Sequence, residues 1–302
     1  MFPYREPLTS PVPQKTLDAR KGWAVLDELP LRGSGVAEAG LAVPPARMRR
    51  WQRGRPLKRW RYLGAYGPEL MVCAGDARIG PLRQRFWAVA TPDGQIVERT
   101  ALAGSGGVSV ALPVVTIDSR RVRARLEARE QPGVETLSRH GDSYIWTSKQ
   151  GGVAVEGFVE LDGRRHDVGC YGIVDDSAGY HSRHTMWTWS AGVGRTPGDR
   201  HVAWNLVTGV HDDPRASERT IWLDGQPTET GPVTFADDLS SIEFSDGGEL
   251  TFSEWSARED HTNALLLRSD YRQPFGSFSG TLPGQVTLTE GYGVMERHDV
   301  YW

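Results

Sequence analysis

The residues best suited to chemistry begin in residues 179–192, GYHSRHTMWTWSAG. This stretch contains His181 and His184, and the carboxylate of Asp176 precedes it by a few residues. Histidine titrates near neutral pH, so an imidazole beside a carboxylate can act as a general acid or base. The alternative is structural, because histidines in Trp-rich surroundings also form hydrogen bonds with a buried tyrosine or a backbone carbonyl. Both interpretations stay open at this point.

The C-terminal residues 291–302, GYGVMERHDVYW, have a similar composition. They add Glu296 and His298 to the titratable side chains. We expect the two stretches to converge on one pocket. Its predicted catalytic residues are Asp176, His181, His184 and His298.

Both stretches are predicted to be strands, because Trp and Thr favour strands and glycines bracket the first run. Successive side chains of a strand point to opposite faces. His184 therefore shares one face with Met186, and Trp187 lies on the other. By the same alternation, Glu296 and His298 share a face of the C-terminal strand.

Aromatic side chains with a few polar groups are typical walls of small-molecule pockets. The predicted ligand-binding residues are Tyr180, Trp187, Trp189, Trp204, Asn205 and Glu296. Packing inside a barrel would explain the same tryptophans equally well. Asn205 lies in an otherwise apolar run and must be hydrogen-bonded if it is buried. It either orients a ligand or ties two strands together.

A metal site is a competing hypothesis. Three histidines, His181, His184 and His298, could bind zinc or iron together with Asp176 or Glu296. Residues three apart in a regular strand point to opposite faces, however, and the helical H-E-x-x-H motif is missing. We therefore expect no metal. The sequence also lacks a nucleophile elbow, a phosphate loop, a dinucleotide fingerprint and a C-x-x-C pair, so we expect no cofactor.

Composition narrows the function classes. The 302 residues carry a net charge of −3, with 24% charged residues and eleven tryptophans, which is typical of a globular, turn-rich chain. Cys73 and Cys170 form neither a metal spacing nor a disulfide framework, which indicates a reducing, cytoplasmic location. The sequence has no apolar leader and no run long enough to span a membrane, so we expect no integral membrane segment.

Residues 47–61, RMRRWQRGRPLKRWR, hold eight basic residues and no acidic one. With Trp51 and Trp60 interleaved, the stretch could bind nucleic acid or an acidic lipid. A solvated arm that leads into the first strand is the favoured interpretation, because the chain as a whole lacks a basic excess. We expect no nucleic-acid partner, and the role of the stretch stays open.

Short alternating runs separated by turn signals predict an all-β chain. Roughly sixteen to eighteen strands are expected, enough for two lipocalin-like antiparallel barrels in tandem. Residues 120–130 alternate apolar and charged residues, which favours a strand over a helix. The expected division is a Pro-rich irregular segment over 1–46, a first barrel-like half over 47–150, and a second half over 151–302 that carries the His/Trp-rich motifs.

Four segments together resemble the bacterial domain-of-unknown-function family 2804. They are GYHSRHTMWTWSAG, VAWNLVTGVHDD, YRQPFGSFSG and GYGVMERHDVYW, and PLKRWRY near the start fits as well. The resemblance covers roughly Arg47 to Trp302. The chain is also distantly similar to a lipocalin-like tandem-barrel group that includes carotenoid hydratases and AttH-like proteins. That similarity implies two calycin-type barrels and an apolar ligand, as an analogy of fold.

Two classes of function follow as expectations. One is a cofactor-independent hydratase, cyclase or isomerase that acts on an isoprenoid- or polyketide-like substrate. In it, a protonated histidine or aspartic acid activates an alkene, and tryptophan faces stabilise the cation that forms. The other is a non-catalytic lipocalin-like protein that binds a hydrophobic ligand. In both cases the partner is a lipophilic small molecule, and the chain is expected to be a monomer or a weak oligomer.

Overall fold

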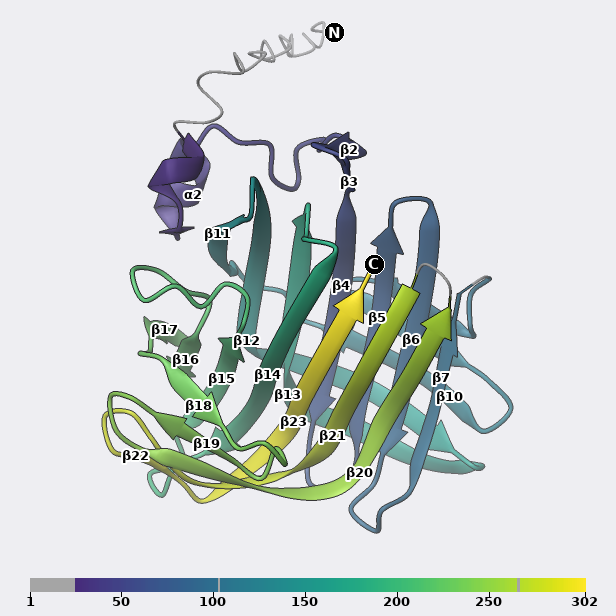
Figure 1. The fold of residues 1–302 in the computed structure, drawn as a ribbon. Coiled ribbons are helices and arrows are strands. Elements are labelled where there is room, and N and C mark those ends of the chain that lie inside the picture. The colour runs from purple at the N-terminus through teal and green to yellow at the C-terminus, as the bar shows by residue number, and fades with distance from the viewer. Residues whose placement is uncertain (1–24, 103, 265–266) are drawn as a thin grey trace, which may run out of the picture.

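The computed structural model describes residues 25–102, 104–264 and 267–302, most of which lie in two large antiparallel sheets (Figure 1). Before the first sheet come helical residues 25–28, β1 (Leu31–Arg32) and α2 (Ser34–Glu38). A small hairpin of β2 (Trp51–Gln52) and β3 (Arg55–Pro56) follows. The predicted all-β fold class is confirmed. The first 24 residues of the predicted Pro-rich segment lie outside the described residues.

The first sheet has eleven strands. Its path runs through β7 (Ile96–Ala101), β6 (Leu82–Ala90), β5 (Met71–Ile79), β4 (Lys58–Tyr66), β13 (Arg164–Gly179), β12 (Ser143–Leu161), β10 (Val122–Ala128), β9 (Val114–Asp118) and β8 (Val108–Ala111). Off this path, β11 (Val134–His140) pairs with both β1 and β12. The strand predicted within residues 120–130 is β10, whose burial alternates residue by residue as the sequence indicated.

The second sheet has ten strands. Its path runs through β17 (Gln226–Glu229), β16 (Thr220–Leu223), β15 (His201–Thr208), β14 (His184–Arg195), β23 (Glu290–Tyr301), β21 (Leu267–Leu282), β20 (Glu249–Ala264), β19 (Ser241–Phe244) and β18 (Val233–Phe235). Off this path, β22 (Val286–Leu288) pairs with β21. Both sheets are antiparallel and strongly curled, as expected of barrel-like units (Figure 1).

The chain crosses from the first sheet to the second at residues 180–183. The predicted seam near residue 150 falls inside β12, so residues 151–179 belong to the first sheet and not to the second. The reason is a bulge. Gly151 and Gly152 resemble a break in the sequence, but Gly152, with φ of 71°, bends β12 without ending its pairing with β13. Whether the two sheets are separate folding units stays a prediction.

Apolar side chains pack in distinct layers. The concave face of the first sheet is aliphatic, with Leu63, Val72, Leu126, Val155 and Val174 among its members. The concave face of the second sheet holds Trp204, Leu206, Phe252, Phe278 and Met295. Between the sheets lie Tyr62, Met71, Ile173, Trp189 and Phe275, contributed by both. The central strands are therefore buried on both faces.

One end of the sheets, the upper end in Figure 1, positions the site described below. Here β4, β6, β12 and β14 begin, and β5, β11, β13 and β23 end, as their pairing registers require. The β2–β3 hairpin and the described part of the N-terminal segment also lie at this end (Figure 1).

Candidate functional site

The two sheets face each other across a layer of buried aromatic and polar side chains, which we call the inter-sheet layer. From β14, Trp187 points into it, and its ring lies 4.5 Å from that of His298 on β23. From the first sheet, Trp60 lies nearly parallel to Trp187, with ring centroids 6.5 Å apart. The predicted strand alternation is confirmed here: Trp187 and Trp189 share this layer with Glu296 and His298.

Glu296 is the best-connected carboxyl group of the layer. One of its oxygens accepts a hydrogen bond from Trp187 Nε1 at 2.7 Å. The other accepts from the Tyr271 hydroxyl and from Gln273 Nε2, both at 3.0 Å. Burial raises the pKa of Glu296, although the hydrogen bonds from Trp187 and Tyr271 act against the rise. A buried carboxyl that holds its proton more firmly is suited to general acid–base chemistry.

Arg258 connects the hydrogen-bond network of Glu296 with the first sheet. Its guanidinium donates to Glu98 Oε2 of β7 at 2.8 Å and to the Tyr271 hydroxyl at 3.3 Å. It also lies over the ring of Phe86, at 4.5 Å. Because the side chain is only 4% exposed, it holds Tyr271 in place from a fixed position. Sequence patterns did not indicate that Arg258, a residue of β20, is buried or bound to Glu98 and Tyr271.

A second buried network lies on the opposite side of the layer. Lys149 Nζ lies 2.7 Å from Asp175 Oδ1 and 3.4 Å from Glu218 Oε1. Asn205 donates to the backbone oxygen of Glu218 at 3.1 Å and accepts from Trp189 Nε1 at 2.8 Å. Burial raises the pKa of Asp175 to about 6. Asn205 therefore ties its strand to its neighbours, and a ligand contact for it stays a prediction.

Three histidines meet at the upper end of the layer, and we call them the imidazole group: His140, His181 and His211. The ring of His181 lies 5.0 Å from Trp60 and 5.7 Å from His140. His211 Nδ1 lies 2.9 Å from the Ser138 hydroxyl. Buried His140 Nε2, His181 Nδ1 and His211 Nε2 have no hydrogen-bond partner among the described residues. Such atoms are rare in folded proteins, where buried polar groups are nearly always paired.

The imidazole group is uncharged at neutral pH. Burial, with Arg55 and Lys58 nearby, lowers the pKa of His140 to about 4. Burial also lowers the pKa values of His181 and His211 well below their usual range. Lys58, whose ammonium donates to the His181 carbonyl at 3.1 Å, has its pKa lowered to about 7 by burial and by Arg55. Neutral imidazoles can accept protons, so the proton-donating role that the sequence suggested for a histidine does not fit His181.

The structure separates His184 from His298, so one pocket that contains both is wrong. His184 points to the opposite face of β14, where its ring stacks on Tyr301 at 4.0 Å and its Nε2 lies 2.8 Å from Asp299 Oδ1. Its side chain is 42% exposed. His298 faces the inter-sheet layer, where burial lowers its pKa to about 3. Alternation along two paired strands makes this separation unavoidable.

Three other predicted residues also lie outside the layer. Asp176 points to the concave side of the first sheet, where Arg61 binds its two oxygens at 2.8 and 2.7 Å. Trp204 packs on the concave side of the second sheet and donates to the Ser190 hydroxyl at 3.1 Å. Tyr180 packs under the N-terminal segment and donates to the Arg49 carbonyl at 2.8 Å.

Sequence reasoning missed several members of the layer. They are Lys58, His140, Lys149, Asp175, His211, Glu218, Arg258, Tyr271 and Gln273. Asp175 gave a usable signal, because it is adjacent to Asp176 and alternation placed one of the pair on each face. Lys58, His211, Tyr271 and Gln273 lie in segments that carry the family resemblance. The others come from strands or loops whose pairing partners are distant in sequence.

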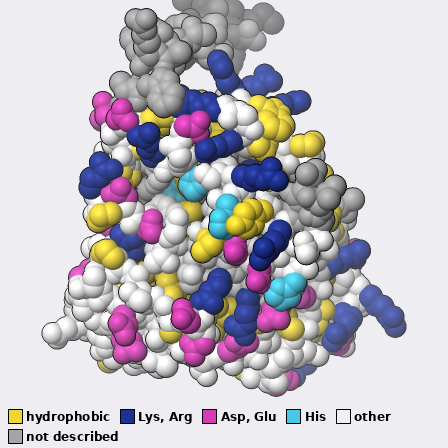
Figure 2. Space-filling model, viewed as in Figure 1, with side chains coloured by type: hydrophobic (Ala, Val, Ile, Leu, Met, Phe, Trp, Pro, Cys, Tyr) yellow, Lys and Arg dark blue, Asp and Glu magenta, His cyan; other side chains and the backbone are white. Residues whose placement is uncertain are grey.

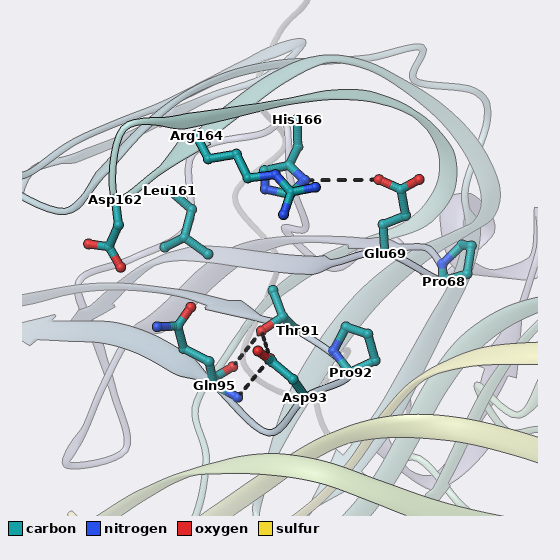
Figure 3. Close-up of a pocket in the computed structure, with 10 residues that line it drawn as sticks. All are labelled: Pro68, Glu69, Thr91, Pro92, Asp93, Gln95, Leu161, Asp162, Arg164 and His166. Atoms are coloured by element: carbon teal, nitrogen blue, oxygen red, sulfur yellow. Dashed lines mark hydrogen bonds and ion pairs between the residues drawn. The ribbon is translucent and has the colours of Figure 1, made fainter.

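Two open cavities lie elsewhere on the surface. The larger, of about 620 Å³, lies at the lower end of the first sheet and is lined by residues of turns and strand ends that include Glu69, Asp93, Asp162 and His166 (Figure 3). In this cavity, His166 Nδ1 lies 3.9 Å from Glu69 Oε2. The second, of about 330 Å³, is lined by Asp270, Asp299 and neighbouring charged residues of the second sheet. No predicted catalytic residue lines either cavity.

Within residues 25–102, 104–264 and 267–302, no three His, Cys, Asp or Glu side chains are grouped so that they could hold a metal ion. None of the helices in the described residues is long and apolar enough to cross a membrane. No curated protein matches the sequence.

The family model described as "Domain of unknown function (DUF2804)" matches residues 94–302. Among solved structures, a protein assigned as an AttH from Nitrosomonas europaea is 12% identical, with a TM-score of 0.47 over 85% of this chain and 98% of that one. Kievitone hydratase from Nectria haematococca is 8% identical, with a TM-score of 0.45 over 80% and 88%. CghA with Sch210972 is 10% identical, with a TM-score of 0.43 over 81% and 88%. Likeness at this level carries no argument about activity.

Proposed function

We propose that this chain, which belongs to the DUF2804 family, is a cofactor-independent enzyme that moves a proton on a lipophilic substrate held in the inter-sheet layer. One observation carries the proposal: buried imidazole nitrogens without partners lie next to stacked tryptophan rings and on the same side of the second sheet as a carboxyl group with a raised pKa. Buried titratable groups with shifted pKa values are typical of functional sites.

The roles follow from the protonation states. Glu296, whose pKa is raised, is the proton donor, and the neutral imidazoles of His181 and His140 are proton acceptors. Protonation of an alkene by Glu296 leaves a carbocation, which the faces of Trp60 and Trp187 stabilise. An imidazole then takes a proton from an attacking water, which gives hydration, or from a neighbouring carbon, which gives isomerisation or the end of a cyclisation. The imidazolium then releases its proton and Glu296 takes one up, so both groups return to their starting protonation states and no net proton is consumed.

The side chains of the inter-sheet layer indicate the class of substrate. Trp60 and Trp187 present large apolar faces, and the imidazoles beside them, His181 and His298, are uncharged. Such a lining suits an uncharged, unsaturated molecule of the isoprenoid or polyketide kind. Since the upper end of the layer is where the sheets and the β2–β3 hairpin meet, we propose that the ligand enters there.

The experiment uses tryptophan fluorescence to titrate the protein with isoprenoid alcohols and polyketide-like enones, and then follows deuterium uptake by the bound molecules in D2O. Glu296→Gln keeps the shape of the side chain and should reduce uptake about 10²–10⁴-fold with binding retained. Glu254→Gln, an exposed carboxylate that pairs with Arg272 at 2.7 Å, is the matched control and should change neither. Full deuterium uptake by Glu296→Gln, or no binding of any compound, would contradict the proposal.

A second candidate is a carrier in which the same residues only shape the binding space. The observation that favours it is that both oxygens of Glu296 already accept hydrogen bonds from protein groups. A carrier would bind ligands of the panel with no deuterium uptake in any variant. His181→Ala separates the two as well, because it should abolish uptake in an enzyme but only weaken binding in a carrier.

A further inference from the structure

The large hydrophobic side chains that stay exposed are not spread evenly over the molecule. Among the described residues they are Trp51, Leu82, Leu102, Met186 and Tyr301, with exposures of 58%, 62%, 65%, 53% and 37%. Isolated exposed apolar residues are ordinary, but a gathering of them marks an interaction surface.

All five lie at the upper end. Leu82 begins β6 and pairs with Ile79, the last residue of β5. Tyr301 ends β23 and pairs with His184, the first residue of β14, two positions before Met186. Trp51 lies in the hairpin that precedes β4. Leu102 follows the end of β7, whose last residue pairs with Arg85 near the start of β6.

The same end is basic, although the chain as a whole carries a net charge of −3. Among the exposed arginines here that have no ion pair within the described residues are five near the crossing between the sheets and the hairpin: Arg47, Arg49, Arg50, Arg59 and Arg183. Figure 2 shows Lys and Arg side chains and hydrophobic side chains next to each other at this end. An exposed apolar set within unpaired positive charge complements a surface that is negative outside and apolar beneath.

The hairpin that carries Trp51 is anchored to the site. Arg55 donates to the His140 carbonyl at 2.7 Å and to the Tyr180 carbonyl at 3.2 Å, and it pairs with Asp142 at 2.8 Å. Trp51 is therefore exposed on a hairpin that Arg55 holds against the segment of His140 and Tyr180. Whatever binds the hairpin lies where the two sheets meet.

We infer that the upper end, defined by the five exposed hydrophobic residues and the five unpaired arginines, docks on the surface of an anionic lipid bilayer. A nucleic acid would use the arginines and Trp51, but it would leave Leu82, Leu102 and Met186 without a role. A bilayer uses both sets, because aliphatic and aromatic side chains enter the headgroup region while arginines contact lipid phosphates. Docking would bring a lipophilic molecule to the inter-sheet layer, but it is measurable without any substrate and does not depend on the proposed activity.

The experiment is co-sedimentation of the full chain with phosphatidylcholine vesicles that contain or lack phosphatidylglycerol, at low and high salt. The expected result is binding to the anionic vesicles alone, weakened by salt. Arg49→Glu/Arg50→Glu/Arg59→Glu should weaken it at least about tenfold, and Trp51→Ser should weaken it severalfold. The matched control, Arg120→Glu/Arg125→Glu/Arg164→Glu, reverses three exposed arginines away from this end and should leave binding within about twofold.

Circular dichroism of each variant establishes that it is folded, and Trp51 is exposed enough to be replaced without loss of the core. Equal binding to neutral vesicles, no binding to either kind, or an equal loss in the control triple variant would overturn the proposal. So would unchanged vesicle binding by Trp51→Ser together with displacement of the vesicles by duplex DNA, because that result would make the end a nucleic-acid surface.

Discussion

The concave interior of the first sheet and the inter-sheet layer are both deeply buried, but their chemistry differs. The interior is built from Val, Leu and Ala side chains with Trp87. The layer contains Lys149, Asp175, Arg258 and Glu296, each less than 10% exposed. Burying charged groups costs free energy that aliphatic packing does not, even when the groups are paired. The difference indicates that the interior holds the fold together, while the layer keeps polar groups for specificity or function.

A single strand shows how close the two environments are. On β13, Val174 belongs to the aliphatic interior, whereas Asp175, the next residue, points into the inter-sheet layer and contacts Lys149. Successive residues of a strand point to opposite faces, so a single strand can contribute side chains to both regions. If the regions differ as their composition indicates, substitutions in the layer should change how the free energy of unfolding depends on pH, and substitutions in the interior should not.

The largest expected effect is that acidification lowers the free energy of unfolding. The cause is the buried histidines of the inter-sheet layer, and the aliphatic interior should not contribute to it. The pKa of His140 is about 4 and that of His298 about 3, whereas an unfolded histidine has 6.5. From pH 6.5 to about 4, the unfolded chain binds protons that the folded chain does not, so the free energy of unfolding should fall by about 1.4 kcal/mol per pH unit for each such imidazole. Asp175 opposes this below pH 6, because its raised pKa makes the folded state bind the extra proton.

The measurement is urea unfolding at several pH values. His298→Phe should flatten the dependence of the unfolding free energy on pH, because one buried titratable group is gone. Leu126→Ala, a variant of the aliphatic interior, should lower the unfolding free energy at every pH and leave the slope unchanged. Equal slopes in the wild type and His298→Phe would show that the imidazole does not titrate as its burial requires.

The next largest effect is expected for Lys149→Ala. Removing the ammonium leaves Asp175 and Glu218 buried without their cation, which should cost about 3–5 kcal/mol of unfolding free energy at pH 7. The cost should shrink near pH 5, because Asp175 can then take up a proton. The interior variant Leu126→Ala also loses about 2–5 kcal/mol, but with no such pH dependence. A pH-independent cost for Lys149→Ala would remove the distinction between the two regions.

The fold was largely predictable from the sequence because strand signals are local. Alternation and turn residues predicted strands within residues 120–130, 179–192 and 291–302, where the structure has β10, β14 and β23. The seam was not predictable, because the bulge at Gly152 has the same sequence signature as a turn. The cytoplasmic location and monomeric state remain predictions.

The site was predictable only in part, for a physical reason. Alternation correctly put Trp187 on the face opposite His184, and Glu296 on the same face as His298, since that needs only the chain's own period. It could not bring His140 or Lys149 to them, because those contacts depend on how one sheet packs on the other. Composition alone also put His184 and His298 in one pocket, although their own strands send them to opposite faces.

The smallest expected effect is that of His184→Ala. The sequence predicted His184 to be a catalytic residue of the pocket, but the structure places it on the outer face of β14. The pair of His184 and Asp299 is 42% and 39% exposed, and such pairs contribute at most about 1 kcal/mol. Unfolding free energy, ligand binding and deuterium uptake should therefore change little. His181→Ala, the same substitution three residues earlier on a side chain that is 2% exposed, should abolish uptake. The reverse pattern, with uptake lost in His184→Ala and kept in His181→Ala, would place the chemistry on the outer face of the second sheet and leave the inter-sheet layer as packing alone.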